Sequence, residues 1–251
     1  MGRRFSVAYL ADLFARILRL GRSEVGALVA LTVVAGGVAT FLEVADDMTE
    51  ADGQALDLAV LHALRPNPAN LHDALGPPWL EHAMAELTSL GGLSVLLAFA
   101  TAAVGFLVMQ KRRGSAMFLG FTLAGGLGLS EFFKGMFERG RPDAVYRTFE
   151  TINASFPSGH ALMATVFYLT IGVMVARTQT RKRVKAYMVG VAVALALIVG
   201  VTRVWLGAHW LSDVLAGWSL GAAWAMFVWL SAYLIARWRA RHDVASLDHR
   251  R

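Results

Sequence analysis

Cysteine is absent from this chain of 251 residues, and charged residues are scarce. The absence of cysteine excludes disulfides and thiolate metal sites, although it names no cellular compartment. Charged residues make up 17% of the chain and hydrophobic residues 56%, whereas a soluble domain usually has about 25% charged residues. With a mean hydropathy of +0.51, the composition excludes an ordinary soluble protein and predicts an integral membrane protein.

Long apolar runs divide the chain, and each is close to the roughly 20 residues that cross a bilayer as a helix. They cover residues 25–42, 87–109, 114–130, 161–176, 186–202 and 214–236. The fourth run is short and spans the bilayer only if its helix also includes residues 158–160. The sequence therefore predicts an all-α, polytopic membrane protein with six transmembrane helices. Apolar residues at helical spacing between positions 56 and 64 add a short interfacial helix between the first two of them.

Basic residues are unevenly distributed, and short basic loops stay on the cytoplasmic side of a membrane. Residues 3–22, 111–113, 177–185 and 237–251 contain 18 of the 24 arginines and lysines. Six spans place all four segments on one face, so both termini are predicted to be cytoplasmic, in a cell (inner) membrane. The same asymmetry explains the net charge of +6. It gives no support to nucleic-acid binding, which requires a basic patch on a folded soluble surface.

Polar residues interrupt the apolar pattern at the ends of the later spans. They form three groups: Lys134, Arg141 and Pro142; Pro157, Ser158, Gly159 and His160; and Arg203, His209 and Asp213. Charged groups beside hydrocarbon require a partner or a ligand. The loop between the third and fourth spans and the loop between the fifth and sixth open on the same, outer side. The three groups are therefore predicted to be neighbours on that side.

The residue types in these groups suit a phosphoryl ligand. Lys134, Arg141 and Arg203 supply cationic donors that match phosphate oxygens. Ser158 and Gly159 bring a hydroxyl and backbone amides to the start of a helix, where anions bind. Each has a plainer interpretation, because a basic residue at the membrane edge commonly extends to the headgroups and serine is an ordinary helix cap. Their convergence on one face favours a phosphate site.

His209 and Asp213 are four residues apart, so on a helix they share a face and the carboxylate can orient the imidazole. Such a pair is also half of a metal site. No cysteine and no further carboxylates cluster at these loops, however, and the cations there repel a metal ion. The sequence therefore predicts a site with no metal and no other cofactor.

In this order and spacing, the three groups resemble the three signature motifs of the type 2 phosphatidic acid phosphatase (PAP2) superfamily. The motifs are Lys134-x6-Arg141-Pro142, Pro157-Ser158-Gly159-His160 and Arg203-x5-His209-x3-Asp213. The spans from residue 87 to 236 resemble the six-helix bacterial-type membrane members, and Thr202 stands where the family commonly has another hydroxyl residue, serine.

The resemblance implies a role for each of these residues. His209 attacks phosphorus to form a phosphohistidine, and Asp213 fixes its tautomer. His160 protonates the leaving oxygen and then activates water. The residues implied to bind the phosphate are Lys134, Arg141, Ser158, Gly159 and Arg203.

The protein is expected to be an integral membrane phosphatase that hydrolyses a lipid phosphate or diphosphate at the outer leaflet. The substrates left open are a polyprenyl diphosphate such as undecaprenyl diphosphate, phosphatidic acid, phosphatidylglycerol phosphate and a lipid A phosphate. The sequence does not predict an oligomeric state. One alternative is a phosphotransferase that passes the phosphoryl group to an acceptor lipid or sugar. Another, from a different class, is an anion or lipid transporter, since charged residues in spans often mark a translocation path.

Four segments follow from this interpretation. Residues 1–22 are a cytoplasmic basic amphipathic lead, and residues 23–86 contain the first transmembrane helix and an acidic extracytoplasmic segment. Residues 87–236 form the catalytic membrane core, and residues 237–251 are a cytoplasmic basic tail. Two structural expectations concern single residues. Glu131 or Glu138 is expected to pair with Lys134 or Arg139, and glycines are expected to allow close helix packing at positions 125, 126, 128, 217 and 221.

Overall fold

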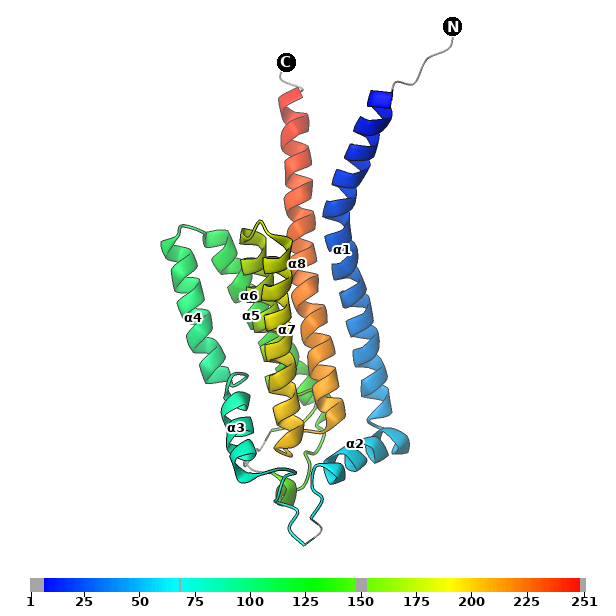
Figure 1. Cartoon of the computed structure of the whole chain (residues 1–251), viewed down its shortest axis with the longest axis vertical. Helices are drawn as coiled ribbons and strands as arrows, with labels where there is room; N and C mark the ends of the chain where they lie inside the picture. Colours follow the sequence, from blue (N-terminus) through cyan, green and yellow to red (C-terminus); the bar gives the residue numbers. More distant parts are fainter. Residues whose placement is uncertain (1–6, 68, 148–152, 249–251) are drawn as a thin grey trace. The chain divides into compact units, whose positions relative to one another are not determined.

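A computed structural model describes the backbone of residues 7–67, 69–147 and 153–248, and the side chains of residues 24–240 within those ranges. The described residues form helices and loops, without strands (Figure 1). They divide into two compact units, residues 1–35 with 226–251 and residues 36–225, and each unit is considered by itself. The side chains of the predicted lead, and of residues 241–251 in the predicted tail, lie outside the described residues.

The helices agree with the predicted all-α membrane architecture. The long ones are α1 (Val7–Asp47), α5 (Arg113–Phe137), α6 (Gly159–Thr178), α7 (Lys182–Trp205) and α8 (Leu211–Asp248). The shorter ones are α2 (Ala51–Ala63), α3 (Pro78–Ser89), α4 (Leu93–Met109) and a 3-10 turn, η1 (Ala144–Tyr146). Among the described residues, five helices are long and apolar enough to cross a membrane, and α3 with α4 forms a sixth candidate, bent by 45°. The helix predicted between the first two spans is confirmed as α2.

The second predicted span, residues 87–109, is broken between α3 and α4. Gly91 lies at the break, and a Cβ there would be 2.3 Å from Val199 Cγ1 on α7 and 3.3 Å from the His160 carbonyl oxygen on α6. The backbone thus approaches two helices too closely for any side chain. The break is set by packing, which an uninterrupted apolar run does not reveal.

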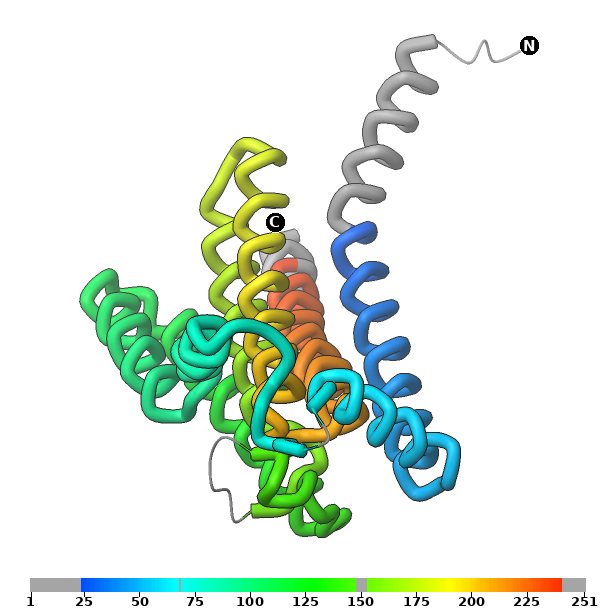
Figure 2. Tube along the Cα trace, turned by 60° about the horizontal axis from the view of Figure 1, so that its bottom comes forward, coloured from blue at the N-terminus to red at the C-terminus, as the bar shows by residue number. Residues whose placement is uncertain are grey.

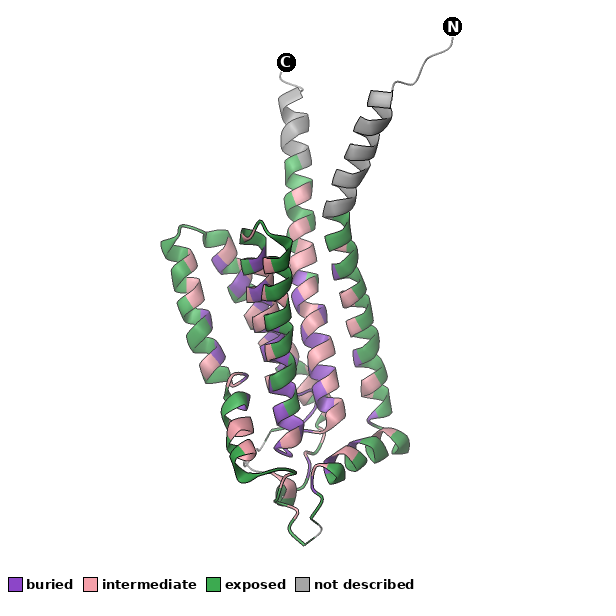
Figure 3. Cartoon of the chain, in the orientation of Figure 1, coloured by how far each residue is buried: buried purple, intermediate pink, exposed green. Residues whose placement is uncertain are grey.

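Helix α6 is central within residues 36–225. The buried share of its apolar stretch is 56%, whereas that of α5 is 28% and that of α7 is 22% (Figure 3). Its buried Leu162 and Val166 belong to a core that also includes Phe156, in the loop before α6, and Phe41 on α1. Because the loop before α6 is anchored in this core, the start of α6 is held firmly.

The glycines predicted to allow close helix packing do so with one exception. A Cβ at Gly217 on α8 would lie 2.8 Å from the Ser158 carbonyl oxygen, so α6 and α8 approach backbone to backbone. Gly128 on α5 is the exception, because nothing lies within 4 Å of its Cβ position. Close neighbours are also found at Gly125, Gly126 and Gly221.

Within residues 36–225, antiparallel helices place the basic loops and the polar groups at opposite ends. Helix α5 runs from the basic residues 111–113 toward Lys134, and α6 runs from Ser158 toward the basic residues 177–185 (Figure 1). Helix α2 and the segment that leads to α3 lie at the polar end, where this segment curves past the end of α7 (Figure 2). The loops after α5 and α7 therefore meet at one end, as predicted, and part of the acidic segment lies over them.

Candidate active site

The loop after α7 folds back over the end of the helix. Gly207 has φ +63°, and the N–H groups of Gly207 and Ala208 donate to the carbonyls of Val204 and Arg203, both at 3.0 Å. This is the hydrogen-bond pattern of a Schellman motif, in which glycine supplies the left-handed residue. The N–H of His209 also donates to the Arg203 carbonyl, at 3.2 Å. The turn explains why the spacing between Arg203 and His209 brings the imidazole back to the arginine.

Asp213 lies in the first turn of α8 and is fully buried. Its Oδ2 accepts from the backbone N–H of Trp210 at 3.0 Å, as an acidic residue in a capping box does. The same oxygen lies 3.2 Å from His209 Nδ1. The predicted contact between the two residues is present, although His209 is in the turn before α8 and not on the helix. The Schellman turn and the helix start together hold the pair.

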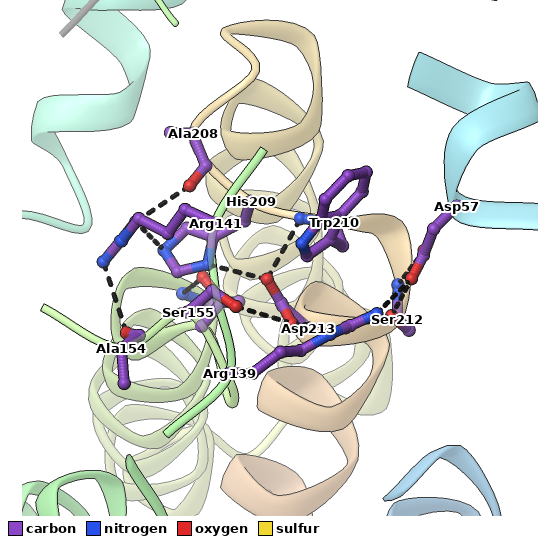
Figure 4. A network of polar contacts seen from close by, with 12 residues as sticks. Asp57, Arg139, Arg141, Ala154, Ser155, Ala208, His209, Trp210, Ser212 and Asp213 are labelled. Carbon is purple, nitrogen blue, oxygen red and sulfur yellow. Dashed lines mark hydrogen bonds and ion pairs between the residues drawn. The ribbon is translucent and has the colours of Figure 1, made fainter. Parts of the chain in front are cut away.

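Arg141 identifies the tautomer of His209. Its Nη1 lies 3.0 Å from His209 Nε2 and donates to the Ala208 carbonyl at 2.8 Å. A guanidinium donates hydrogen bonds and cannot accept them, so Nε2 must be the unprotonated nitrogen. The ring proton is then on Nδ1, directed at Asp213. Figure 4 shows the ring between these two partners.

Burial keeps this ring neutral. His209 is 2% exposed. Burial lowers the pKa of His209 to about 4, aided by the positive charges of Arg141 and Arg203 and opposed by Asp213. At pH 7 the imidazole is therefore uncharged, with a lone pair on Nε2.

The other two cations approach the site from α5 and α7. Arg203 is 5% exposed, and its Nη1 donates to Thr88 Oγ1 at 3.1 Å. Its buried Nε has no hydrogen-bond partner among the described residues. A buried cationic donor without an acceptor is costly, so this geometry favours an anion beside Arg203. Lys134 pairs with Glu131 at 3.0 Å, as predicted, and its Nζ lies 3.2 Å from where a Cβ on Gly159 would be. Glycine at this position leaves room for the ammonium group.

The start of α6 completes the cluster. Ser158 is the N-cap residue: its Oγ accepts from the Ala161 N–H at 3.5 Å, and its own N–H donates to the Asp213 carbonyl at 2.9 Å. His160, in the first turn, is close enough to interact electrostatically with His209 and with the three cations Lys134, Arg141 and Arg203. The structure thus brings all eight predicted site residues to one end of the bundle: Lys134, Arg141, Ser158, Gly159, His160, Arg203, His209 and Asp213.

Sequence reasoning missed the role of Arg139, which contacts this cluster, and that of Asp57, which binds Arg139. Arg139 donates from Nη1 to Asp213 Oδ1 and from Nη2 to Asp57 Oδ2, both at 2.7 Å. The signal for Arg139 was its position two residues before Arg141 on an extended segment. Asp57 had no such signal, because it was one acid among many in the segment before the second span.

A cavity of about 610 Å³ opens beside the cluster. Lys134 and Arg141 line it, together with Glu138 and Arg147, but His160 and His209 do not. The cavity therefore adjoins the phosphate-binding candidates and not the imidazoles themselves. Among the residues that the structure describes, no three His, Asp or Glu side chains are grouped to hold a metal ion.

Comparison with known proteins gives concordant matches. Residues 115–237 match the model of the PAP2 superfamily. The chain is 31% identical over 145 residues to phosphatidylglycerophosphatase B of Bacillus subtilis (strain 168). The aligned region covers 57% of this chain and 71% of the relative. It is 32% identical over 162 residues to lipid A 1-phosphatase of Rhizobium johnstonii, covering 57% of this chain and 61% of that protein.

Two solved structures have a similar arrangement of helices. The transmembrane PAP2 type phosphatidylglycerolphosphate phosphatase from Bacillus subtilis matches with a TM-score of 0.71 and 26% identity, over 78% of this chain and 94% of that one. Aquifex aeolicus LpxE shares the fold, with a TM-score of 0.51 and 21% identity over 68% of this chain and 93% of that one. From the family match and the sequence relatives together, we conclude that this chain belongs to the PAP2 superfamily.

Proposed function

We propose that this chain is an integral membrane lipid phosphatase that hydrolyses a lipid phosphate or diphosphate through a phosphohistidine on His209. One observation carries the proposal: Nδ1 of the buried ring faces Asp213, while Nε2 faces Arg141. The nitrogen with the lone pair is thus directed to the side where the cations gather and an anionic phosphoryl group binds. Both sequence relatives are lipid phosphatases by name, which supports a lipid substrate.

In the first step, His209 Nε2 attacks phosphorus in line, and the bond between phosphorus and the leaving oxygen breaks. His160 donates a proton to that oxygen as it leaves. The phosphorylated ring keeps its Nδ1 proton and becomes positively charged, so Asp213, 3.2 Å from Nδ1, stabilises it. Arg141 exchanges its contact with Nε2 for the phosphoryl oxygens.

In the second step, water replaces the ring. His160, now neutral, takes a proton from the water, whose oxygen attacks phosphorus. The bond between phosphorus and Nε2 breaks, its electron pair returns to Nε2, and inorganic phosphate leaves. The proton that His160 gave to the leaving group is thereby replaced, and the site is ready for another turnover.

Charge stabilisation of the phosphoryl group comes from three sides. Arg203 contributes a buried Nε to which no described residue bonds, and Arg141 contributes the guanidinium beside Nε2. Lys134 adds a point charge beside Gly159, where the amides at the start of α6 also favour an anion. These groups act without a metal ion in this mechanism, so activity is expected to persist when a chelator is added.

We place the site on the extracytoplasmic side and both termini in the cytoplasm. Support comes from residues 36–225, where the basic segments 111–113 and 177–185 lie at the end opposite to the site. A reporter fused after residue 251 is expected to be cytoplasmic, and one inserted between residues 46 and 81 to be external. The opposite result would move the reaction to the inner leaflet.

The function is tested by phosphate release from detergent-purified protein given a panel of lipid phosphates and diphosphates, without an acceptor. Release is expected from at least one substrate, with and without chelator, and it is expected to vanish in His209→Ala. The matched control is His72→Ala, which removes an exposed imidazole from the segment before α3. Phosphate transfer that requires an added acceptor would indicate a phosphotransferase. Full turnover by His209→Ala would refute the proposal.

A further inference from the structure

Asp57 is a buried acid on a largely exposed helix. It lies on α2, within the acidic segment between the first two spans, and is 3% exposed. Leu61, one turn later, is the other buried residue of α2, whereas Asp52 on the same helix is exposed. A buried carboxylate is costly unless its oxygens are paired, so its partners indicate what it does.

Both oxygens of Asp57 are engaged at the start of α8. Oδ1 accepts from the backbone N–H of Ser212 at 2.9 Å, and Oδ2 accepts from the Ser212 hydroxyl. Oδ2 also accepts from Arg139 Nη2 at 2.7 Å. Arg139 is 13% exposed and lies over the ring of Trp210, 5.7 Å from its centroid. Asp57 on α2 therefore contacts Ser212, the residue next to Asp213, although Asp57 and Ser212 are 155 positions apart in the sequence.

Arg139 connects this carboxylate to that of Asp213. Its Nη2 binds Asp57 and its Nη1 binds Asp213 Oδ1, each at 2.7 Å (Figure 4). Asp213 Oδ2 is thereby left for His209 Nδ1 and the Trp210 N–H. The chain of contacts runs from α2 through one guanidinium and one carboxylate to the imidazole.

We propose that Asp57 and Arg139 are positioning residues for the nucleophile, so that α2 of the acidic segment is part of the catalytic apparatus. This inference rests on the proposed role of His209. Arg139 fixes the plane of the Asp213 carboxylate, since two of its N–H groups hold acids on either side. Asp57 in turn holds Arg139 and the first turn of α8.

The charges add a second reason. Asp57, Arg139 and Asp213 together carry a net charge of −1, and this charge faces a ring that becomes positive when Nε2 is phosphorylated. Without Asp57 the remaining two charges cancel, so the phosphorylated ring loses stabilisation. The incoming phosphate is itself an anion, and the described contacts of Asp57 are with Ser212 and Arg139, not with Lys134, Arg141 or Arg203. Its removal is therefore expected to lower kcat and to leave KM unchanged or lower.

The test compares Asp57→Asn with Asp52→Asn, which removes the same charge from an exposed site on the same helix. Asp57→Asn is expected to lower kcat roughly tenfold without raising KM, while Asp52→Asn stays within about twofold of the wild type for both constants. Asp57→Glu, which restores the charge with one extra methylene, is expected to recover part of kcat. A purely structural role of Asp57 would instead lower the melting temperature and the active fraction, with kcat per folded site unchanged.

A double-mutant cycle with Arg139→Gln sharpens the test. If the two residues act as one unit, the double variant is expected to lose little more kcat than Arg139→Gln alone, whereas independent losses would multiply. Equal kcat and KM for Asp57→Asn and Asp52→Asn would overturn the inference. If Asp57→Asn is not recovered folded, Arg139→Gln decides: lowered kcat with unchanged KM supports the inference, and wild-type constants overturn it.

His209→Ala, measured in parallel, separates this inference from the proposed function. Loss of turnover in His209→Ala with wild-type kcat in Asp57→Asn would refute only the positioning role. Turnover that survives in His209→Ala would refute the proposed nucleophile, and the positioning role with it.

Discussion

The two faces of the His209 ring are built differently. On the side of Nε2, which we call the phosphate side, the cations are Lys134, Arg141 and Arg203. The buried Nε of Arg203 has no partner in the described part of the chain, and Arg141 donates to backbone carbonyls and to the ring itself. On the side of Nδ1, which we call the anchor side, the residues are Asp57, Arg139, Ser212 and Asp213. There each carboxylate is paired with Arg139 at 2.7 Å.

The two sides of the ring therefore perform two different tasks: one holds the ring and the other binds the anion. Paired charges on the anchor side satisfy one another, so they resist rearrangement and hold the ring in one tautomer. Among the residues that the structure describes, the cations on the phosphate side lack carboxylate partners, apart from the pair between Lys134 and Glu131, and they remain available to an anion. Substitutions on the anchor side are therefore expected to affect kcat, and those on the phosphate side to affect both substrate binding and kcat.

Among substitutions that keep His209, the largest effect is expected from Asp213→Asn. The amide cannot accept the Nδ1 proton with the strength of a carboxylate, and it leaves Arg139 with only one acid. We expect kcat to fall roughly 10³–10⁴-fold, as when the orienting acid of a catalytic triad is lost. Asp73→Asn, an exposed acid between α2 and α3, serves as the control. A loss of less than tenfold in Asp213→Asn would show that the ring is oriented by other contacts.

Arg203→Lys tests the phosphate side by keeping the charge and removing the planar fork. The ammonium has no Nε donor, so it cannot replace the buried group that lacks a protein partner. We expect kcat/KM to fall by roughly 10². Arg112→Lys, at the opposite end of α5, is the matched control because Arg112 is exposed. Unchanged kcat/KM in Arg203→Lys would mean that a point charge suffices there.

Gly207→Ala tests the turn that brings the two sides together. A Cβ on Gly207 would lie 2.1 Å from the Tyr146 carbonyl oxygen, and the residue has φ +63°. The turn must shift, so we expect kcat to fall at least roughly tenfold and the melting temperature to drop by several degrees. Gly190→Ala on α7 is the control, since nothing lies within 4 Å of its Cβ position. Equal melting temperatures for the two variants would contradict the role of this turn.

Protonation of His209 offers a test by pH. Its pKa in the folded protein is about 4, below the usual 6.5, so the unfolded chain binds this proton more readily. The neutral ring therefore contributes stability above pH 6.5, and this stability is lost as the pH falls toward 4. His209→Asn cannot make this change. We expect the melting temperature of the wild type, relative to that of His209→Asn, to decrease from pH 7 to pH 4.5. A constant difference would show that burial does not keep the ring neutral.

The phosphate side was largely predictable from the sequence, and the anchor side, apart from Asp213, was not. Lys134, Arg141 and Arg203 stand at fixed spacing beside apolar spans, where a charge is conspicuous, and the parity of six spans places them at one end. Asp57 lies in an acidic segment where one more carboxylate carries no signal. Its partners are 82 and 155 residues away, and only the folded chain shows which acid turns inward.

Local rules also failed where packing decides. Gly91 breaks the second span because α6 and α7 pass too closely, and Gly128 packs against nothing although it shares a helix with Gly125 and Gly126. The contact between His209 and Asp213 was predicted from a helical spacing of four. The contact is present, but a Schellman turn followed by a helix start produces it. Spacing identified the pair, and turn chemistry determined its geometry.

The smallest effect is expected from Glu131→Gln, which removes the acid that pairs with Lys134. Glu131 is 59% exposed and Lys134 is 15% exposed, so solvent screens the pair and it contributes at most about 1 kcal/mol. Released from Glu131, the ammonium remains beside Gly159 and binds phosphate more readily. We expect KM to fall by no more than about threefold, with kcat unchanged. Glu138→Gln removes the same charge from the same cavity and is expected to leave KM at the wild-type value. Equal falls of KM in both variants would indicate a general effect of cavity charge. A rise in KM for Glu131→Gln would mean that the pair holds Lys134 in its binding position.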